Sequence, residues 1–343
     1  MIKIKKEGII LAPTKLPFES KCVFNPAIYQ DGKNIHVIYR ALDDKFMSCF
    51  GYARLDGPLK VAERWKKPFM EKKFSYESKG IEDPRIVKID DTFYMTYVAH
   101  NGVDAVIAYV AGDTLFDLKR CGIISPKISY KRAGKLFRYT KLKDEYLMFA
   151  GFYENYCAKN VLVWEKDGVL FPEKFHDQFV MLHRILPDIQ AAYFKDFADL
   201  KDENYWHNHI QHLAKHVVLE GRQGFEARHI GAGAPPIKTK KGWLLIYHAV
   251  EPKNKGRIYR AGAALLNLHH PQRVIARLPY PLFSPEEKWE HQGHVHNVVF
   301  PTGTAEFGKK LYIYYGSADT YVACASVDKD KLIDELLKYK VKS

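Results

Sequence analysis

A unit of two strands recurs along the chain, and this repeat constrains the fold more than any other feature. Each unit opens on a turn signal such as Asp31-Gly32 or Lys241-Gly242, and a strand rich in Tyr, Phe, Ile and Val follows. We expect these aromatic strands at residues 34–40, 92–100, 145–152, 178–184, 243–248 and 310–316. Partner strands are expected at residues 48–55, 105–111, 160–164, 258–268 and 321–327. Self-similarity of this kind is typical of radial or stacked β architectures.

The spacing of the units favours a five-bladed β-propeller. Six aromatic strands are expected, but those at 145 and 178 are too close together to belong to two ordinary blades. Aromatic residues make up 14% of the chain, which suits an all-β protein. Helical spacing is confined to an insert between blades at about 196–219 and a C-terminal helix at about 329–340. The C-terminal helix is expected either to close the last blade or to contact a partner subunit in a homo-oligomer. No linker-like tract divides the chain, so a single domain over residues 1–343 is predicted.

Composition argues against several classes of protein. The formal net charge is +13, but Lys and Arg are spread along the chain without a nucleic-acid-binding motif, so no nucleic acid partner is expected. The basic field instead favours an anionic substrate such as phosphate. No segment is long and apolar enough to span a bilayer and the N-terminus lacks a signal-peptide core, so we expect a cytoplasmic protein with no membrane partner. The five cysteines are scattered, and His294 and His296 have no carboxylate partner, so no disulfide framework, metal site or cofactor is predicted.

The stretch Gly80-Ile81-Glu82-Asp83-Pro84-Arg85-Ile86 is the strongest candidate for a functional site. A residue before proline is pushed out of the helical region, so Asp83 is expected on a constrained turn just before a strand. A rigid turn that presents a carboxylate beside Glu82 and Arg85 suits an acid/base group or a sugar-binding site. The alternative is a structural turn in which the Asp simply pairs with the Arg.

Polar side chains recur where the aromatic strands end. The ends carry Arg40, His100, Arg184, His248 and Asp319. In a propeller the equivalent ends of successive blades converge on the central channel, so these residues are predicted to line one polar pocket. The alternative is that each strand ends in a polar residue at the surface.

With these features together, the sequence resembles glycoside hydrolase family 130, the β-mannoside phosphorylases and related β-mannosidases. The matching stretches run in order over almost the whole chain. They are Phe24-Asn25-Pro26, Val37-Ile38-Tyr39-Arg40-Ala41, Gly80-Ile81-Glu82-Asp83-Pro84-Arg85, Leu170-Phe171-Pro172-Glu173-Lys174, Leu182-His183-Arg184, Ile230-Gly231-Ala232-Gly233, Ile246-Tyr247-His248, Tyr259-Arg260-Ala261-Gly262-Ala263-Ala264-Leu265-Leu266, Asn297-Val298-Val299-Phe300-Pro301-Thr302-Gly303 and Tyr314-Tyr315-Gly316-Ser317-Ala318-Asp319. The resemblance implies a five-bladed β-propeller and exo-acting, inverting cleavage of terminal β-mannosides. Its implied partners are a β-mannosyl oligosaccharide and inorganic phosphate as co-substrate.

The resemblance also implies roles for individual residues. Asp83 matches the general acid, which in this family is thought to act through the 3-hydroxyl of the bound mannose. The matches to mannosyl-binding positions are Asn25, Arg40 and Asp319, and we add Glu82, Arg85 and His100 as substrate-binding candidates. The matches to phosphate-binding positions are Arg184, His248 and Tyr259, with Lys166 as a further candidate. Phosphate replaces the base-activated water of an inverting hydrolase, so phosphorolysis needs only one protein acid.

One departure from the family pattern keeps a second reading open. Where phosphorylases of the family usually carry Arg-Asn, this chain has Lys166-Asp167. Lys lacks the bidentate fork of Arg, and Asp167 would repel phosphate if it faced the site. The alternative is therefore a β-mannosidase on β-1,2- or β-1,4-linked mannosides, with Glu226, Asp167 or Glu82 as the base for water. The alternative that is not an enzyme is a non-catalytic sugar-binding propeller.

Overall fold

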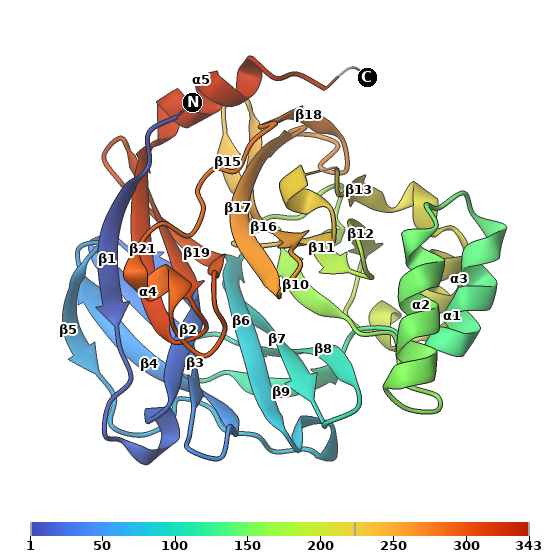
Figure 1. Ribbon diagram of the computed structural model, residues 1–343, viewed down its shortest axis with the longest axis horizontal. Coiled ribbons are helices and arrows are strands. Elements are labelled where there is room, and N and C mark those ends of the chain that lie inside the picture. The colour runs from blue at the N-terminus through green and yellow to red at the C-terminus, as the bar shows by residue number, and fades with distance from the viewer. Residues whose placement is uncertain (1, 223, 342–343) are drawn as a thin grey trace.

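The strands of the computed structural model, which describes residues 2–222 and 224–341, form four sheets, and the fold is all-β with few helices. The eight-stranded sheet consists of two four-stranded units joined by a single parallel pairing, Ser48 with Gly80. Counting these two separately gives five units, which Figure 1 shows arranged around a common centre. Five of the six expected aromatic strands are confirmed, and each lies second in the strand order of its unit.

The strands pair antiparallel within every unit. The first unit holds β2 (Cys22–Asp31), β3 (Asn34–Leu42), β4 (Ser48–Asp56) and β5 (Lys60–Arg64), and the second holds β6 (Gly80–Ile89), β7 (Thr92–His100), β8 (Ala105–Gly112) and β9 (Lys119–Ile123). The third holds β10 (Lys166–Leu170), β11 (Phe179–Arg184), β12 (Ile189–Phe194) and β13 (Val217–Leu219). The fourth holds β14 (His229–Ala232), β16 (Gly242–Pro252), β17 (Arg257–Leu266) and β18 (Val274–Arg277), with β15 (Ile237–Thr239) paired to β16. The fifth holds β19 (Val299–Phe307), β20 (Lys310–Ser317), β21 (Tyr321–Asp328) and, from the other end of the chain, β1 (Lys5–Leu11).

The core lies between the units. Five large apolar clusters each join two units that are neighbours around the centre. Pairs of residues that share a cluster but come from neighbouring units include Tyr52 and Tyr97, Tyr109 and Phe179, Leu182 and Trp243, Leu265 and Ile313, and Tyr314 and Tyr39. The last pair shows that the fifth unit packs against the first, so each unit has a packed neighbour on both sides. Burial of both faces of each sheet explains why the strands read as apolar, aromatic runs.

A buried triad of side chains recurs in four of the units. A Tyr hydroxyl from the second strand donates to a Glu that is at most 2% exposed, and a cation pairs with the same Glu. The four sets are Tyr39–Glu19–Arg64, Tyr97–Glu77–Arg120, Tyr247–Glu226–Arg277 and Tyr315–Glu290–Lys6. In the third unit His183 takes the place of the Tyr, between Glu165 at 3.0 Å and His209 at 3.1 Å. A buried carboxylate is stable only when it is paired, so the repeat is structural.

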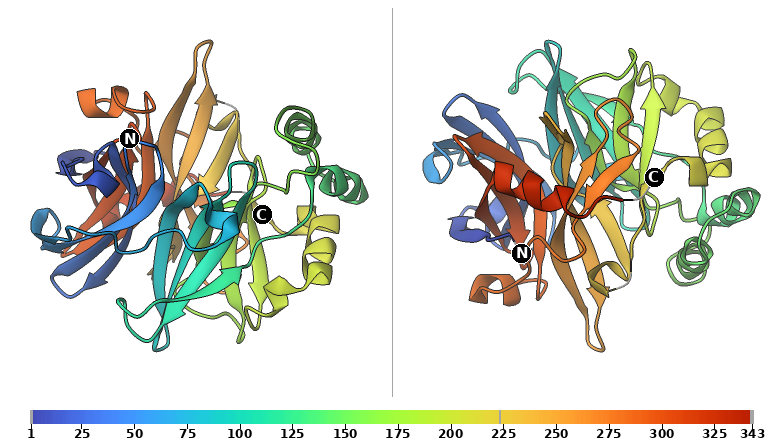
Figure 2. Two further views of the ribbon diagram at one scale, coloured as in Figure 1. Left: turned by 90° about the horizontal axis from the view of Figure 1, so that it is seen from below. Right: turned by 90° about the horizontal axis from the view of Figure 1, so that it is seen from above.

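Most of the helical residues lie together on one side of the molecule, as Figures 1 and 2 show. Helices α1 (Tyr130–Leu136) and α2 (Glu145–Tyr156) lie between the second and third units along the chain, and α3 (Glu203–Gln211) joins them on the same side of the molecule. Helix α5 (Lys329–Leu337) occupies the C-terminal range, and α4 (Lys288–His291) is a single turn. Short 3-10 turns lie at Pro17–Glu19, Ser75–Glu77, Phe137–Tyr139, Asp199–Lys201, Leu213–Lys215 and Gly224–Glu226. None of the helices in the described ranges is long and apolar enough to cross a membrane.

Three sequence expectations about these segments were wrong. Residues 145–152 are not a strand but part of helix α2, which buries Tyr146, Phe149 and Ala150 at helical spacing. A short apolar run does not by itself distinguish a buried strand from a helix. Residues 160–164 contribute only an isolated bridge between Leu162 and Ser129. The helical segment near 196–219 lies inside the third unit, between β12 and β13, and not between two units.

Candidate active site

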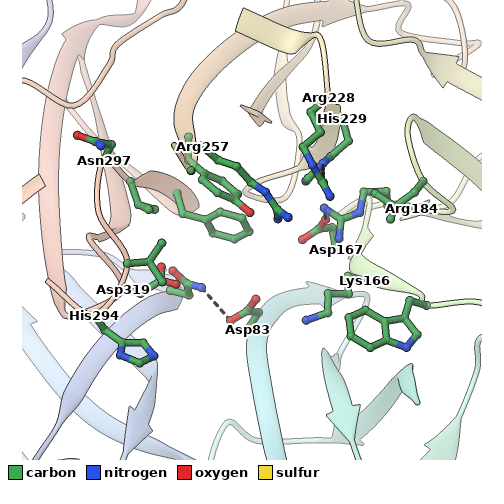
Figure 3. A pocket seen from close by; sticks show the side chains of 18 of the residues that line it. Asp83, Lys166, Asp167, Arg184, Arg228, His229, Arg257, His294, Asn297 and Asp319 are labelled. Carbon is green, nitrogen blue, oxygen red and sulfur yellow. Dashed lines mark hydrogen bonds and ion pairs between the residues drawn. The ribbon is translucent and has the colours of Figure 1, made fainter. Parts of the chain in front are cut away.

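A cavity of about 810 Å³ opens where the five units meet, and every unit contributes to its lining (Figure 3). The predicted site residues that line it are Asn25, Arg40, Asp83, Lys166, Asp167, Arg184, Tyr259 and Asp319. They come from strands far apart in the sequence. A cavity of this volume suits a ligand of more than one sugar ring.

Three of these side chains reach the cavity through the same backbone device. The first strands of the first three units carry a bulge at Asn25-Pro26, Asp83-Pro84 and Asp167-Gly168, each opposite a single residue of the second strand. At each bulge the polar residue has a positive φ, 46° for Asn25, 50° for Asp83 and 57° for Asp167. Asn and Asp tolerate this conformation better than other side chains, and a bulge redirects a side chain out of the strand pattern. Asp83 therefore lies inside β6, and its expected place on a turn before the strand was wrong.

The carboxylate of Asp83 is held at one oxygen. Asn25 Nδ2 donates to Oδ1 at 2.8 Å, and Arg40 Nη1 approaches the same oxygen at 3.3 Å. Arg40 also donates to Glu82 Oε1 at 2.7 Å and to the Ser48 hydroxyl at 3.0 Å. Since both contacts to Asp83 use Oδ1, Oδ2 is the oxygen available to carry a proton toward a ligand.

Glu82 and Asp319 respond to the cations around Asp83 in opposite ways. Burial alone would raise the pKa of Glu82, but Arg40 and Lys166, whose Nζ lies 3.1 Å from Glu82 Oε2, lower it to about 2. Burial raises the pKa of Asp319 to about 7 against the opposing charge of Arg40, and the nearby carboxylates of Asp83 and Glu82 add to the rise. Near neutral pH Glu82 is therefore ionised, whereas Asp319 is protonated in a substantial fraction of the molecules.

A second group of charges lies on the opposite side of the cavity from Asp83 (Figure 3). Arg184 Nη1 pairs with Asp167 Oδ2 at 2.9 Å and contacts His248 Nε2 at 3.2 Å. Arg184 Nε is buried and has no hydrogen-bond partner within the described residues. His248 stacks on Phe300 with ring centroids 4.3 Å apart. Burial and the charge of Arg184 hold the pKa of His248 well below 6.5, so its ring is neutral at pH 7.

Four residues that sequence reasoning missed join this group. Lys255, Arg257, Arg228 and His229 line the cavity, and Figure 3 shows Arg257, Arg228 and His229 close to Arg184. Arg228 Nη1 donates to His229 Nδ1 at 2.7 Å, which leaves Nε2 of that ring to carry the hydrogen. Burial lowers the pKa of His229 well below 6.5, so His229 acts as a neutral donor. Among 53 Lys and Arg residues, Lys255, Arg257 and Arg228 gave no distinguishing signal, and neither did His229 among 15 His, although Arg228 follows Glu226 closely in the sequence.

Five candidates do not line the cavity. His248 and Arg85 lie behind it: Arg85 donates to the carbonyl oxygen of Gly233 at 2.5 Å and lies 4.0 Å from Asp167. Glu82 forms ion pairs with Arg40 and Lys166, as described above. His100 accepts a hydrogen bond from the Gly102 backbone and meets the ring of Trp164 edge-on.

Glu226 is the clearest correction among the site candidates. It accepts a hydrogen bond from the Tyr247 hydroxyl at 2.6 Å, pairs with Arg277 at 2.7 Å, and is only 2% exposed. It is the fourth unit's member of the repeated Tyr–Glu–cation triad. A carboxylate held in this way cannot reach a water in the cavity, so the structure does not support Glu226 as a catalytic base.

Two glycines permit the close packing of the site. A Cβ added at Gly231 would lie 2.8 Å from His248 Nε2 and closer still to Asp167 Oδ2. A Cβ added at Gly316 would lie 3.0 Å from Asn25 Cγ and closer to its Oδ1. Both sides of the cavity therefore depend on a position without a side chain.

Histidines near the cavity do not form a metal cluster. His294 and His296 line the cavity, and His294 stacks on Phe46 at 5.1 Å. Within the described residues, no three His, Cys, Asp or Glu side chains are grouped to hold a metal ion.

Comparisons with known proteins agree with this geometry. A family model described as β-1,4-mannooligosaccharide phosphorylase matches residues 11–157 and 152–338. The chain is 34% identical to a 1,2-β-oligomannan phosphorylase of Thermoanaerobacter sp. (strain X514), covering 96% of this chain and 98% of that protein. It is 33% identical to a β-1,2-mannobiose phosphorylase of the same organism, covering 94% and 96%. A solved β-1,2-mannobiose phosphorylase from Listeria innocua shares the fold with a TM-score of 0.72, at 22% identity over 98% of this chain and 99% of that one.

Proposed function

This chain belongs to glycoside hydrolase family 130, and from that premise we propose that it is a β-mannoside phosphorylase that releases α-mannose 1-phosphate. The observation that carries the proposal is the distribution of charge in the cavity. A carboxylate with one free oxygen, Asp83, lies on one side, and Arg184, Arg228 and Arg257 lie on the other. Bound phosphate would occupy the cationic side and meet the anomeric carbon of a sugar held between the two.

The residues divide the reaction between them. Asn25, Arg40 and Asp319 would hold the terminal mannosyl unit next to Asp83. A phosphate oxygen attacks the anomeric carbon from the side of the arginines while the bond to the leaving oxygen breaks. The leaving oxygen takes a proton from the 3-hydroxyl of the bound mannose, which is replaced by the proton of Asp83 as the family resemblance implies, and the anomeric centre inverts from β to α.

The phosphate site rests on guanidinium and neutral donors. Arg184 has a buried Nε without a partner among the described residues, which a bound anion would satisfy. Arg228 and Arg257 add charge, His229 adds a neutral donor, and Tyr259, whose ring centroid lies 6.3 Å from that of His229, adds a hydroxyl group. Asp167 does not cancel this field, because it is only 3% exposed and lies between Arg184 and Arg85. The Lys166-Asp167 departure is therefore compatible with phosphate binding.

The same geometry counts against hydrolysis. An inverting hydrolase needs a carboxylate base that reaches a water. Glu226 is held in a structural triad, Asp167 is paired with Arg184, and a carboxyl with the low pKa of Glu82 is a weak base. Each of these three carboxylates already pairs with a cation of the protein: Glu226 with Arg277, Asp167 with Arg184, and Glu82 with Arg40.

We extend the proposal to fold and linkage. The five four-stranded units would be the blades of one five-bladed propeller, supported by the repeated triads and by the core clusters that connect the fifth unit with the first. β-1,2-linked mannosides would be the preferred substrates, because the two relatives that match over nearly their whole length are named for β-1,2 compounds.

The proposal is tested by varying phosphate in the presence of β-1,2-mannobiose. Cleavage should saturate with phosphate concentration. In Arg184→Ala the KM for phosphate should rise about 10- to 100-fold, since a hydrogen bond to a charged group is worth roughly 1.5–3 kcal/mol. Arg132→Ala, which removes an exposed arginine from α1, is the control and should leave both KM values unchanged. Cleavage at full rate without phosphate would overturn the proposal.

A further inference from the structure

Helix α2 brings a file of aromatic rings to the cavity that the proposed chemistry does not use. Phe152 and Tyr153 on α2 and Trp164 after it line the cavity, and Tyr156 follows one turn beyond Phe152. Neighbouring ring centroids are 4.8 Å apart for Trp164 and Tyr153, 5.5 Å for Tyr153 and Phe152, and 5.4 Å for Phe152 and Tyr156. We call these four residues the aromatic file.

The inner rings are fixed and the outer rings face solvent. Trp164 Nε1 donates to the carbonyl oxygen of Val103 at 2.8 Å, and Tyr153 stacks on Tyr130 with nearly parallel rings 4.8 Å apart. Phe152 is 51% exposed and Tyr156 is 78% exposed. A contiguous run of exposed aromatic surface that continues a cavity marks a binding surface.

The file lies on the side of Asp83 away from the mannosyl site. In Figure 3, Asp319 and Lys166 lie on opposite sides of Asp83. The Nζ of Lys166 is 5.7 Å from the Trp164 ring, so the file begins on the Lys166 side. With the terminal mannosyl unit held on the Asp319 side, the leaving sugar would extend on the other side of Asp83, toward Trp164.

We infer that the aromatic file binds the leaving part of a β-mannosyl oligosaccharide, with Trp164 and Tyr153 beneath the first leaving sugar and Phe152 and Tyr156 beneath the next. The inference rests on the proposed function in assigning Asp83 as the acid. Flat aromatic faces suit the C–H faces of sugar rings, since the face of the ring is its negative side. The file would make a chain of three or more mannoses a better substrate than mannobiose.

The test compares chain lengths in variants of the exposed rings. In Phe152→Ala, kcat/KM for β-1,2-mannotriose should fall about 3- to 10-fold, a typical contribution of an aromatic contact, while kcat/KM for β-1,2-mannobiose and the KM for phosphate change little. Tyr139→Ala is the control: it removes another aromatic ring of the helical insertion, which is 72% exposed and lies outside the cavity lining. It should leave kcat/KM for both sugars unchanged. An unchanged ratio of mannotriose to mannobiose in Phe152→Ala would overturn the inference.

A binding measurement separates this inference from the proposed function. Cys157 is exposed and lines the cavity at the end of α2. In Asp83→Asn without phosphate, mannotriose should slow alkylation of Cys157 more than mannobiose does, whether or not the wild type is a phosphorylase. Equal protection by the two sugars would contradict the inference. A change of oligomeric state in Phe152→Ala or Tyr156→Ala would also overturn it, because a second copy of the chain would then cover the rings.

Discussion

Gly231→Ala is predicted to weaken phosphate binding in the cavity while leaving sugar binding largely unchanged. The added Cβ would lie 2.8 Å from His248 Nε2 and closer to Asp167 Oδ2, whereas ordinary contact begins at 3.4 Å. Both groups touch Arg184, and both must retreat by at least about half an ångström, because the backbone of β14 is held along its length by its pairing with β16. A displacement of about 1 Å can cost ~100-fold in rate.

We therefore expect Gly231→Ala to raise the KM for phosphate and lower kcat so that kcat/KM for phosphate falls about 10- to 100-fold. The KM for mannobiose should change much less. The assay is initial-rate kinetics with each substrate varied in turn, with circular dichroism to confirm folding.

Two glycine variants serve as controls. Gly316→Ala crowds Asn25 instead, so it should raise the KM for mannobiose more than that for phosphate. Gly134→Ala on α1 meets only Ala150 at 3.7 Å, an ordinary contact, and should behave as the wild type. A wild-type KM for phosphate in folded Gly231→Ala would refute the assignment of Arg184 and its partners as the phosphate site.

Three further predictions concern the carboxyl groups. Asp83→Asn keeps the shape of the side chain but removes the acid, so kcat should fall at least ~100-fold with sugar binding largely kept, and a near-normal kcat would exclude Asp83 as the acid. Glu226→Gln leaves Arg277 uncompensated beside Tyr247, so the free energy of unfolding should fall by roughly 3 kcal/mol, as for other broken buried pairs, while kcat per folded molecule stays near wild type; a loss of kcat like that of Asp83→Asn would instead favour hydrolysis. The pKa of Asp319 rises from 3.8 to about 7 on folding, so between these pH values the folded chain holds a proton that the unfolded chain has lost, and stability falls as pH rises from about 4 to 7. Asp319→Asn should lack this decline, and urea unfolding of both proteins at several pH values would show parallel curves if the assignment is wrong.

The strands and the acid side of the site could be predicted from the sequence. Turn signals followed by aromatic runs located β3, β7, β11, β16 and β20, because these strands are buried on both faces and carry few polar residues. Asn25 and Asp83 could be predicted as site residues because each precedes a proline in a stretch that matches the family. Helix α2 was mistaken for a strand because its apolar residues form a continuous short run, and only its packing on α1 reveals the helical face.

The cationic side could be predicted only in part. Arg184 stands at a strand end, where the repeat draws attention to it. Arg228, His229 and Arg257 all come from the fourth unit, and they reach Arg184 only because that unit packs against the third, a tertiary fact without a local signal. Glu226 was wrongly predicted as a catalytic base because its structural role is visible only in three dimensions. There it occupies the same position in its unit as Glu19, Glu77 and Glu290 occupy in theirs.

The stereochemistry of the first product tests the central claim most directly. Proton and phosphorus NMR can follow β-1,2-mannobiose in phosphate buffer from the first minutes of the reaction. The account predicts that α-mannose 1-phosphate and free mannose appear in equal amounts, because phosphate attacks from the arginine side while Asp83 protonates the leaving sugar. Two free mannoses for each mannobiose, or a β-linked phosphate, would contradict it.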